Sequence, residues 1–308
     1  MTAPPFPTDD SLLSLDVGAT RIRAAVVGQG RVLARRSERW GDAASGEEEL
    51  DRLLGIARSL AESAPEPVRA VGLSHPAWMA DGVVASWPNR PHWQGLPVAT
   101  RLQEVLRVPA RQEEDARAAT LAEWRWGAGR AVSHGMFVSV GSGIGAGLVL
   151  EGRLVRGAQD RAGGLGHVAV GPGGPPCPCG GRGCLQLAAS GWALDARARA
   201  LGRRDAREIL AAAVADPRAH EALEHATTTL AWVLGREARL LDLSAVVLGG
   251  GLGASRGAWW RSLRAALKRE APDLELRRAA LGEDAALWGA AALAADAARE
   301  RVLAGGDP

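Results

Sequence analysis

The sequence of 308 residues is poor in cysteine, lysine and tyrosine, and it has no large excess of positive or negative charge. Tyrosine is absent and the only lysine is Lys268, so the basic charge is almost entirely arginine. We interpret this skew as coding bias and infer no function from arginine as a class. Lys and Arg together number 37 against 35 Asp and Glu, so no overall positive field favours binding of nucleic acid.

Long apolar runs are also missing, which argues against a membrane span. The longest uncharged stretch, residues 131–150, contains one histidine and five glycines, and such a composition suits a membrane helix poorly. Residues 1–10 contain neither a basic start nor an apolar core, so we predict no secretory signal. We therefore expect a cytoplasmic protein without a membrane partner.

The length suits two lobes better than one compact core. Short apolar runs joined by glycine-containing turns predict strands at residues 11–15, 22–27 and 31–35. A similar run predicts strands at 136–140 and 148–150, around the turn GSGIGAG. The shared plan indicates a weak internal duplication, with one copy in each lobe.

A helix is expected to begin after Ser45, because Ser45 and Glu48 form a capping box, and to end before Pro65. Apolar spacing predicts the remaining elements. Helices are expected at 98–106, 116–126, 219–241 and 284–302, strands at 68–73, 83–85 and 246–248, and an irregular loop at 163–184.

The first glycine turn, DVGATR, follows a predicted strand and leads into the next. Such a turn leaves backbone N–H groups unpaired, and a group of them can bind phosphate. Its candidate residues are Asp16, which could hold magnesium, Thr20, which could donate to a phosphate oxygen, and Gly18 and Arg21. Taken alone, the segment is equally well explained as a tight turn capped by Asp16.

Two further glycine turns strengthen this interpretation. Gly141, Ser142 and Gly143 begin GSGIGAG, which matches the dinucleotide fingerprint, but a strand follows where that fingerprint requires a helix. Gly250 and Gly251 lie in GGGLG, interpreted as a strand-to-helix turn suited to an adenosine phosphate or as a plain connection. Together the three turns favour a two-lobed nucleotide clamp.

The three cysteines lie within eight residues of one another, which favours a metal site in a reducing compartment over disulfides. His167, Cys177, Cys179 and Cys184 form H-x9-C-x-C-x4-C. Three thiolates and an imidazole complete the tetrahedral shell of a structural zinc ion and leave no open position for catalysis. The alternatives are three free thiols and an ordinary hydrogen-bonded histidine.

With these motifs, the chain resembles the ROK family (repressors, open reading frames and sugar kinases) of the actin-like and hexokinase-like superfamily. Its two phosphate turns are similar to LDVGATRIRAAVV and VSVGSGIGAGLVLEGRLVRGA, and its zinc signature is similar to AGGLGH with CPCGGRGCLQ. Its adenosine motif is similar to VVLGGGLG, and its closing helix is similar to ALGEDAALWGAAALA.

The resemblance implies an α/β fold of two actin-like (ribonuclease H-like) lobes with a nucleotide cleft between them and a zinc loop in the second lobe. We expect a smaller lobe at 1–117 plus 287–308 and a larger one at 118–286. It further implies ATP and Mg²⁺ as well as structural Zn²⁺, a small-molecule sugar, and a homodimer.

The implied mechanism is attack of a sugar hydroxyl on the γ-phosphate, with an aspartate accepting the proton. EEDARAATLAE is similar to the family motif Asn-Asp-Ala-Asn, which identifies Asp115 as the base. Without the family, Asp115 would be interpreted as a helix N-cap. The sugar contacts implied are Asn89, Glu114, Asp115, His167 and Gln186; Asn89 is equally well a turn residue beside Pro88.

Three sugar-contact positions depart from the family pattern. Glu114 stands where the family has Asn, and Gly164 and Gln186 stand where it has Glu. Gly164 removes a charged acceptor, Gln186 keeps an acceptor without charge, and Glu114 is expected to add a negative charge beside Asp115. These departures predict a glucokinase-like protein in which either the substrate differs from glucose or catalysis is weak or lost.

Two functions remain open. The first is an ATP-dependent sugar kinase with an altered sugar pocket, and the alternative is a catalytically weak or inactive sugar-binding sensor or scaffold. A DNA-binding repressor is disfavoured, because ten residues before the first strand are too few for a helix-turn-helix.

Overall fold

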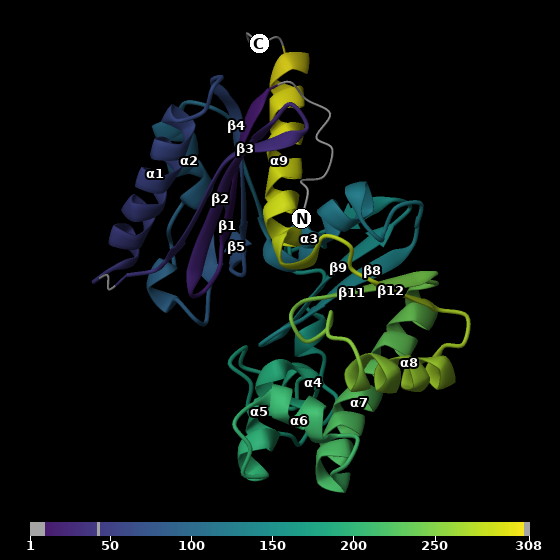
Figure 1. The fold of residues 1–308 in the computed structure, drawn as a ribbon. Helices are drawn as coiled ribbons and strands as arrows, with labels where there is room; N and C mark the ends of the chain where they lie inside the picture. Colours follow the sequence, from purple (N-terminus) through teal and green to yellow (C-terminus); the bar gives the residue numbers. More distant parts are fainter. Residues whose placement is uncertain (1–9, 42–43, 305–308) are drawn as a thin grey trace. The chain divides into compact units, whose positions relative to one another are not determined.

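The computed structural model describes residues 10–41 and 44–304 (Figure 1). Residues 1–10 were predicted to contain no secretory signal, and of these only residue 10 is among the described residues. The chain divides into two compact units. Unit 1 contains residues 1–126, 157–161 and 284–308, and unit 2 contains residues 127–156 and 162–283.

The sheet of unit 1 has the strand order β3–β2–β1–β4–β7. β1 (Ser11–Val17), β2 (Arg21–Gly28) and β3 (Arg31–Arg39) form an antiparallel meander. β4 (Val68–His75) pairs with β1 in parallel, and β7 (Ala110–Glu114) pairs with β4 in parallel. β1 is central and almost wholly buried, as its continuous apolar run predicts.

Helices cover both faces of this sheet (Figure 1). α1 (Gly46–Glu62) and α2 (Val98–Leu106) pack on one face, and α3 (Asp115–Trp126) and α9 (Ala285–Leu303) pack together on the other. The two-residue period of β1 divides its side chains accordingly. Leu13 and Leu15 join the core beneath α1, whereas Ser14 donates a hydrogen bond to a backbone carbonyl of α9.

The predicted start of α1 is confirmed. The Ser45 hydroxyl accepts the amide hydrogen of Glu48, with an N···O distance of 3.2 Å, and the Glu48 carboxylate accepts from the amide of Ala44 at 2.6 Å. These bonds satisfy amides that have no partner within the helix. Between β4 and α2 lie the hairpin β5 (Trp78–Ala80) and β6 (Val83–Ser86) and the short helix η1 (Pro91–Trp93).

The sheet of unit 2 repeats the plan of unit 1, with the order β10–β9–β8–β11–β12. β8 (Gly135–Val140), β9 (Ile144–Leu150) and β10 (Arg153–Val155) form a meander, and β11 (Ala245–Gly249) and β12 (Glu275–Arg278) extend it in parallel. The predicted internal duplication is therefore visible as equal topology, and the predicted α/β class is confirmed.

The helices of unit 2 share one core with β8 and β11. The long helix α7 packs against α8, and the shorter helices pack on α7. Among the described residues, no helix is both long and apolar enough to cross a membrane. The bounds are α4 (Gln186–Ala189), α5 (Gly191–Ala200), α6 (Ala206–Ala212), α7 (Pro217–Leu241), α8 (Ala258–Glu270), η2 (Leu165–His167) and η3 (Gly282–Asp284).

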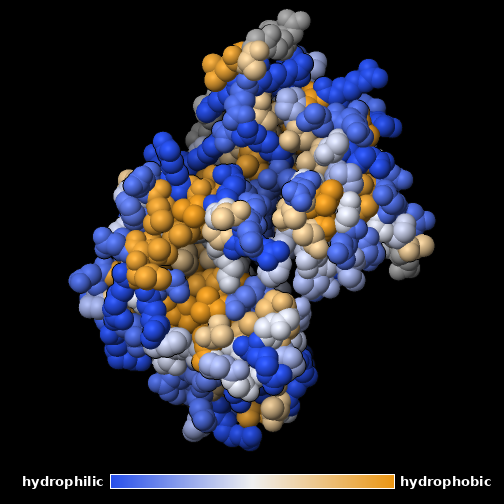
Figure 2. All heavy atoms as spheres, turned by 180° about the vertical axis from the view of Figure 1, so that it is seen from behind, coloured by the Kyte–Doolittle hydropathy of each residue, from blue (hydrophilic) through white to orange (hydrophobic). Residues whose placement is uncertain are grey.

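Viewed from behind, hydrophilic side chains cover much of the visible surface, with apolar patches between them (Figure 2). The large apolar residues exposed in the described part of the chain are Trp192, Val214, Trp232, Leu240, Val302 and Leu303.

The division between the units differs from the sequence-based one. Divisions after residues 117 and 286 would cut through α3 and α9, whereas the compact units divide after Trp126 and before Asp284. The reason is that α3 and α9 pack on each other and on β4, so both helices stay whole within unit 1.

Glycine makes the contacts of α9 possible. A Cβ atom on Gly72 in β4 would lie 1.8 Å from the carbonyl oxygen of Ala290, and one on Gly289 would lie 1.9 Å from that of Ala118. Backbone atoms cannot yield as a flexible side chain can, so any larger residue must push the elements apart.

We predict that Gly72→Ala lowers the free energy of unfolding by about 3 kcal/mol, because the added methyl group overpacks the core. Gly55→Ala is the matched control: this exposed glycine of α1 has free space around it and should gain about 0.5–1 kcal/mol. Urea unfolding measures both. Equal midpoints for Gly72→Ala and the natural protein would contradict the close packing of α9.

Candidate active site and metal centre

Carboxyl groups gather where the parallel strands of unit 1 end. Asp16 lies near the end of β1, and Glu114 and Asp115 lie at the end of β7 and the start of α3. β4 runs between these strands, and its Ser74 hydroxyl donates to Asp16 Oδ1 at 2.7 Å. Ligands of α/β proteins commonly bind at the carboxyl ends of the strands. The structure thus brings the predicted magnesium ligand and the predicted base to one edge of the sheet.

The pKa of Asp16 is raised to about 6, chiefly by burial. The Ser74 hydroxyl and the Arg23 guanidinium, 3.5 Å away, lower it, and the charges of Asp115 and Asp284 raise it. A carboxyl that releases its proton only near neutrality is one that a cation would stabilise strongly. The donor type and its surroundings therefore fit Mg²⁺ at Asp16.

The helix cap before α3 is Glu114 rather than Asp115. Glu114 Oε2 accepts the amide hydrogen of Arg117 at 2.9 Å, and the Glu114 amide donates to Glu113 Oε1 at 3.1 Å. Burial, followed by the charge of Asp115 and a hydrogen bond with it, holds the pKa of Glu114 well above its ordinary value. The expected added negative charge is thus opposed, because the protonated carboxyl of Glu114 is favoured.

His75, at the end of β4, is a buried neighbour that sequence analysis missed. It pairs in register with Glu114, and its Nδ1 accepts the amide hydrogen of Ala77 at 3.3 Å, so Nε2 carries the ring proton. Burial, followed by the charge of Arg117, lowers the pKa of His75 to about 4. The imidazole is therefore neutral and adds no charge to the group of carboxyls.

Arg117 and the segment 157–161 were also missed. The Arg117 side chain is only 3% exposed; it donates to Glu113 Oε1 at 2.6 Å and to the backbone carbonyl of Asp160 at 2.6 Å. The carboxylate of Asp160 accepts a further bond at 3.0 Å. Arg161 lies over the Trp78 ring, with 5.4 Å between Cζ and the ring centroid. These contacts hold the segment on unit 1.

Of the remaining predicted residues of unit 1, Arg21 is the first residue of β2 and the others lie in turns. Gly18 and Thr20 form the connection from β1 to β2, where the Gly18 amide donates to the carbonyl of Arg21 at 2.9 Å. Asn89 is exposed in the turn before η1. This confirms the predicted hairpin and leaves the phosphate and sugar roles of these residues as predictions.

In unit 2, two predicted phosphate turns meet at the end of β8. Gly141–Gly143 connect β8 to β9, so the rejection of the dinucleotide fingerprint is confirmed. The amides of Leu252 and Gly253, beside Gly250 and Gly251, donate to the Val140 carbonyl at 2.9 and 2.8 Å. GGGLG begins at the end of β11, and α8 begins at Ala258 after a further turn, so the predicted strand-to-helix connection extends beyond the glycine motif.

The four predicted zinc ligands converge in the loop of unit 2. Their donor atoms all lie within 4.8 Å of one another. His167 Nδ1 is 3.7 Å from Cys177 Sγ, and Cys179 Sγ is 3.7 Å from Cys184 Sγ. A zinc ion with bonds of about 2.0–2.3 Å requires ligand separations of this size. The residues therefore fit a closed tetrahedral zinc site.

The electrostatics of the cluster also fit a cation. Burial and the neighbouring sulfurs raise the pKa of Cys184 to about 12, since several thiolates cannot lie together without a positive charge between them. The amide of Gly181 donates to Cys179 Sγ at 3.4 Å, and Gln186 Nε2 donates to Cys177 Sγ at 3.2 Å. Gln186, predicted to contact sugar, thus supports a ligand sulfur.

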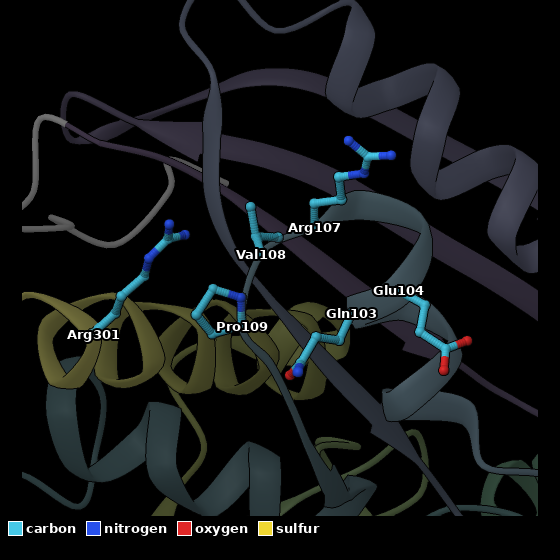
Figure 3. A pocket seen from close by; sticks show the side chains of 6 residues that line it. All are labelled: Gln103, Glu104, Arg107, Val108, Pro109 and Arg301. Carbon is cyan, nitrogen blue, oxygen red and sulfur yellow. The ribbon is translucent and has the colours of Figure 1, made fainter. Parts of the chain in front are cut away.

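A pocket of about 440 Å³ lies elsewhere in unit 1 (Figure 3). Pro109, in its wall, precedes β7, whereas Asp115 follows that strand, so the pocket and the carboxyls lie at opposite ends of β7. It therefore contains none of the predicted site residues. Its lining is Gln103, Glu104, Arg107, Val108, Pro109 and Arg301.

We predict that Asp16→Asn stabilises the ligand-free protein at pH 7. Because folding raises this pKa from 3.8 to about 6, folded protein loses stability through Asp16 as pH rises between these values. The variant should gain up to about 3 kcal/mol above pH 6 and nothing below pH 4. Urea unfolding across pH tests this, with the exposed Asp51→Asn as control. A gain independent of pH would contradict the raised pKa.

We predict about one zinc ion per chain by elemental analysis. Cys179→Ser should lose the metal and lower the melting temperature, because the loop would lose its cross-link. Gln186→Ala, which removes only the donor to Cys177, should retain zinc with about tenfold weaker affinity. Natural protein that is stably folded and free of zinc would refute the metal centre.

Comparison with known proteins places these features in a family. The chain is 35% identical to kanosamine kinase of Amycolatopsis mediterranei over 292 residues, which are 92% of this chain and 95% of that protein. It is 31% identical to N-acetylmannosamine kinase of Citrobacter koseri over 292 residues, which are 92% of this chain and 98% of that protein.

Solved structures agree with this similarity. A ROK hexokinase from Thermus thermophilus has 33% identity and a TM-score of 0.84, covering 94% of this chain and 99% of that one. A ROK family glucokinase from Streptomyces griseus, in complex with glucose and AMPPNP, has 28% identity and a TM-score of 0.78, covering 93% and 99%. The ROK family model matches residues 12–297, and the chain therefore belongs to the ROK family.

Proposed function

We propose that the protein is an ATP-dependent kinase that transfers the γ-phosphate to a hydroxyl of a hexose or hexose derivative. The observation that carries the proposal is the position of Asp115 beside Asp16 at the carboxyl edge of the unit 1 sheet. Glu114 supplies the helix cap, so the cap does not occupy Asp115. The names of the relatives support the class of reaction.

In the proposed mechanism, Asp115 accepts the proton of the attacking sugar hydroxyl. The hydroxyl oxygen bonds to the γ-phosphorus, and the bond from that phosphorus to the bridging oxygen breaks, leaving ADP. Asp16 would hold Mg²⁺, which when bound offsets the charge of the triphosphate. The amides of the turns at 18–20, 141–143 and 250–251 would bind phosphate and adenosine.

We further propose that the substrate differs from glucose in the groups that it offers as donors. Gly164 offers no side-chain acceptor, and the amide nitrogen of Gln186 is bonded to Cys177. A sugar held without these two carboxylates loses charge-assisted hydrogen bonds, each worth about 1.5–3 kcal/mol. Because two relatives are named as kinases of hexosamines, amino and N-acetylamino hexoses are the first substrates to test.

The raised pKa of Glu114, caused chiefly by burial, favours a kinase over an inactive sensor. A second fixed negative charge beside Asp115 would repel the triphosphate, but burial favours the neutral carboxyl of Glu114. A homodimer and a cytoplasmic location complete the proposal. The cytoplasmic location is supported by the three free cysteines, because thiols can bind zinc only in the reduced state.

We predict that ATP, Mg²⁺ and one member of a panel of hexoses and hexosamines give ADP release. Asp115→Asn should lower kcat about 10²–10⁴-fold, because the base is lost while the side-chain shape is kept. Asp81→Asn, in an exposed turn, is the control and should keep full activity. Tight sugar binding without turnover on the whole panel would favour the sensor instead.

A further inference from the structure

A buried ion pair lies beside the β1–β2 turn and has no part in the mechanism above. Glu49 of α1 is paired with Arg90, and their side chains are only 5% and 12% exposed. The carboxylate also accepts hydrogen bonds from the Trp93 indole and from His92 Nε2, the latter at 2.9 Å. Buried pairs of this kind contribute little net stability compared with apolar residues. We therefore ask which part of the backbone this pair holds in place.

The other edge of the Arg90 guanidinium holds the turn itself. Arg90 Nε and Nη2 both donate to the carbonyl oxygen of Ala19, at 3.0 and 2.7 Å. The guanidinium also lies over the Trp40 ring, 4.5 Å from its centroid, and the Trp40 indole N–H donates to the carbonyl of Gly18 at 2.8 Å. Two consecutive carbonyls of the turn are thus held by side chains from other segments.

Fixing these carbonyls also fixes the amides that share their peptide planes. In a trans peptide the C=O and the following N–H point in opposite directions, so the amides of Ala19 and Thr20 point away from Arg90 and Trp40. Within the described residues, neither amide donates a hydrogen bond. Two successive amides without a hydrogen-bond partner that point away from a fixed support are free to donate to a bound anion.

The guanidinium is not placed to bind phosphate directly. Its Nε, Nη1 and Nη2 atoms all make hydrogen bonds, and Glu49 neutralises its charge. An arginine that binds phosphate directly keeps its N–H groups and its charge available for the phosphate. Arg90 instead uses them to hold Ala19 and Glu49.

We propose that Arg90, held by Glu49, is a positioning residue that fixes the turn at Gly18–Thr20 so that the amides of Ala19 and Thr20 bind the phosphates of ATP. Trp40 has the same function through the carbonyl of Gly18. This inference rests on the proposed nucleotide binding, and it adds three residues that no sequence motif identified.

The test compares the affinities of Mg²⁺·AMPPNP and adenosine by titration calorimetry. Arg90→Met and Trp40→Phe should each raise the dissociation constant of AMPPNP about tenfold and leave that of adenosine within twofold, because only the phosphates contact the turn. Arg101→Met is the matched control, since Arg101 pairs with Glu47 and Asp51 of α1. It should change neither constant.

Loss of Arg90 leaves Glu49 buried without its ion-pair partner, which could unfold the protein. The double variant Glu49→Gln with Arg90→Met removes that charge and should show the same selective loss of AMPPNP affinity with a restored unfolding midpoint. Equal losses for both ligands, or no loss for either, would overturn the positioning role.

The kinase proposal fails separately from this one. If the natural protein binds AMPPNP but phosphorylates no sugar, the proposed activity is wrong and the calorimetric comparison still decides the role of Arg90. Natural protein that binds no nucleotide would overturn both.

Discussion

Repulsion among buried carboxyls at one edge of a sheet is the constraint on which the candidate site depends. Asp16, Glu114 and Asp115 lie at the ends of strands β1 and β7, and burial raises the pKa of Asp16 and of Glu114. The Ser74 hydroxyl and the Arg23 guanidinium contact Asp16 and favour its charged form. In the ligand-free site, the neutral forms of Asp16 and Glu114 are therefore favoured. A bound magnesium ion would favour the charged carboxylate of Asp16 instead.

Unit 2 meets a similar constraint with sulfur in place of oxygen. Three thiols and an imidazole converge within a loop, and several thiolates can lie together only around a cation. Gln186 donates to one of these sulfurs and lies beside Gly143 of the phosphate turn. The metal loop and the β8–β9 turn are thus neighbours, and a structural ion would hold the backbone on which the turn depends.

Much of the fold could be predicted because its signals are local. Turn glycines, apolar runs and the Ser45 cap identify the meanders and most helices. β7 and α5 were missed for the same reason: ARQEE has no apolar alternation, and GWALDARARA has no clear apolar face, so only their neighbours make them strand and helix. The start of the helix after GGGLG, at Ala258, was not predicted, because a glycine turn does not fix the length of the connection that follows it.

For the candidate site, the sequence by itself determined the chemistry: which carboxyls, glycines and cysteines occur, and at what spacing along the chain. Only the tertiary structure decided their surroundings. It buries Glu114 as the cap of α3, and it places Arg90 and Trp40 against the carbonyls of a turn far away in the sequence. The physical reason is that protonation and backbone orientation depend on burial and on long-range hydrogen bonds, which no local pattern of residues encodes.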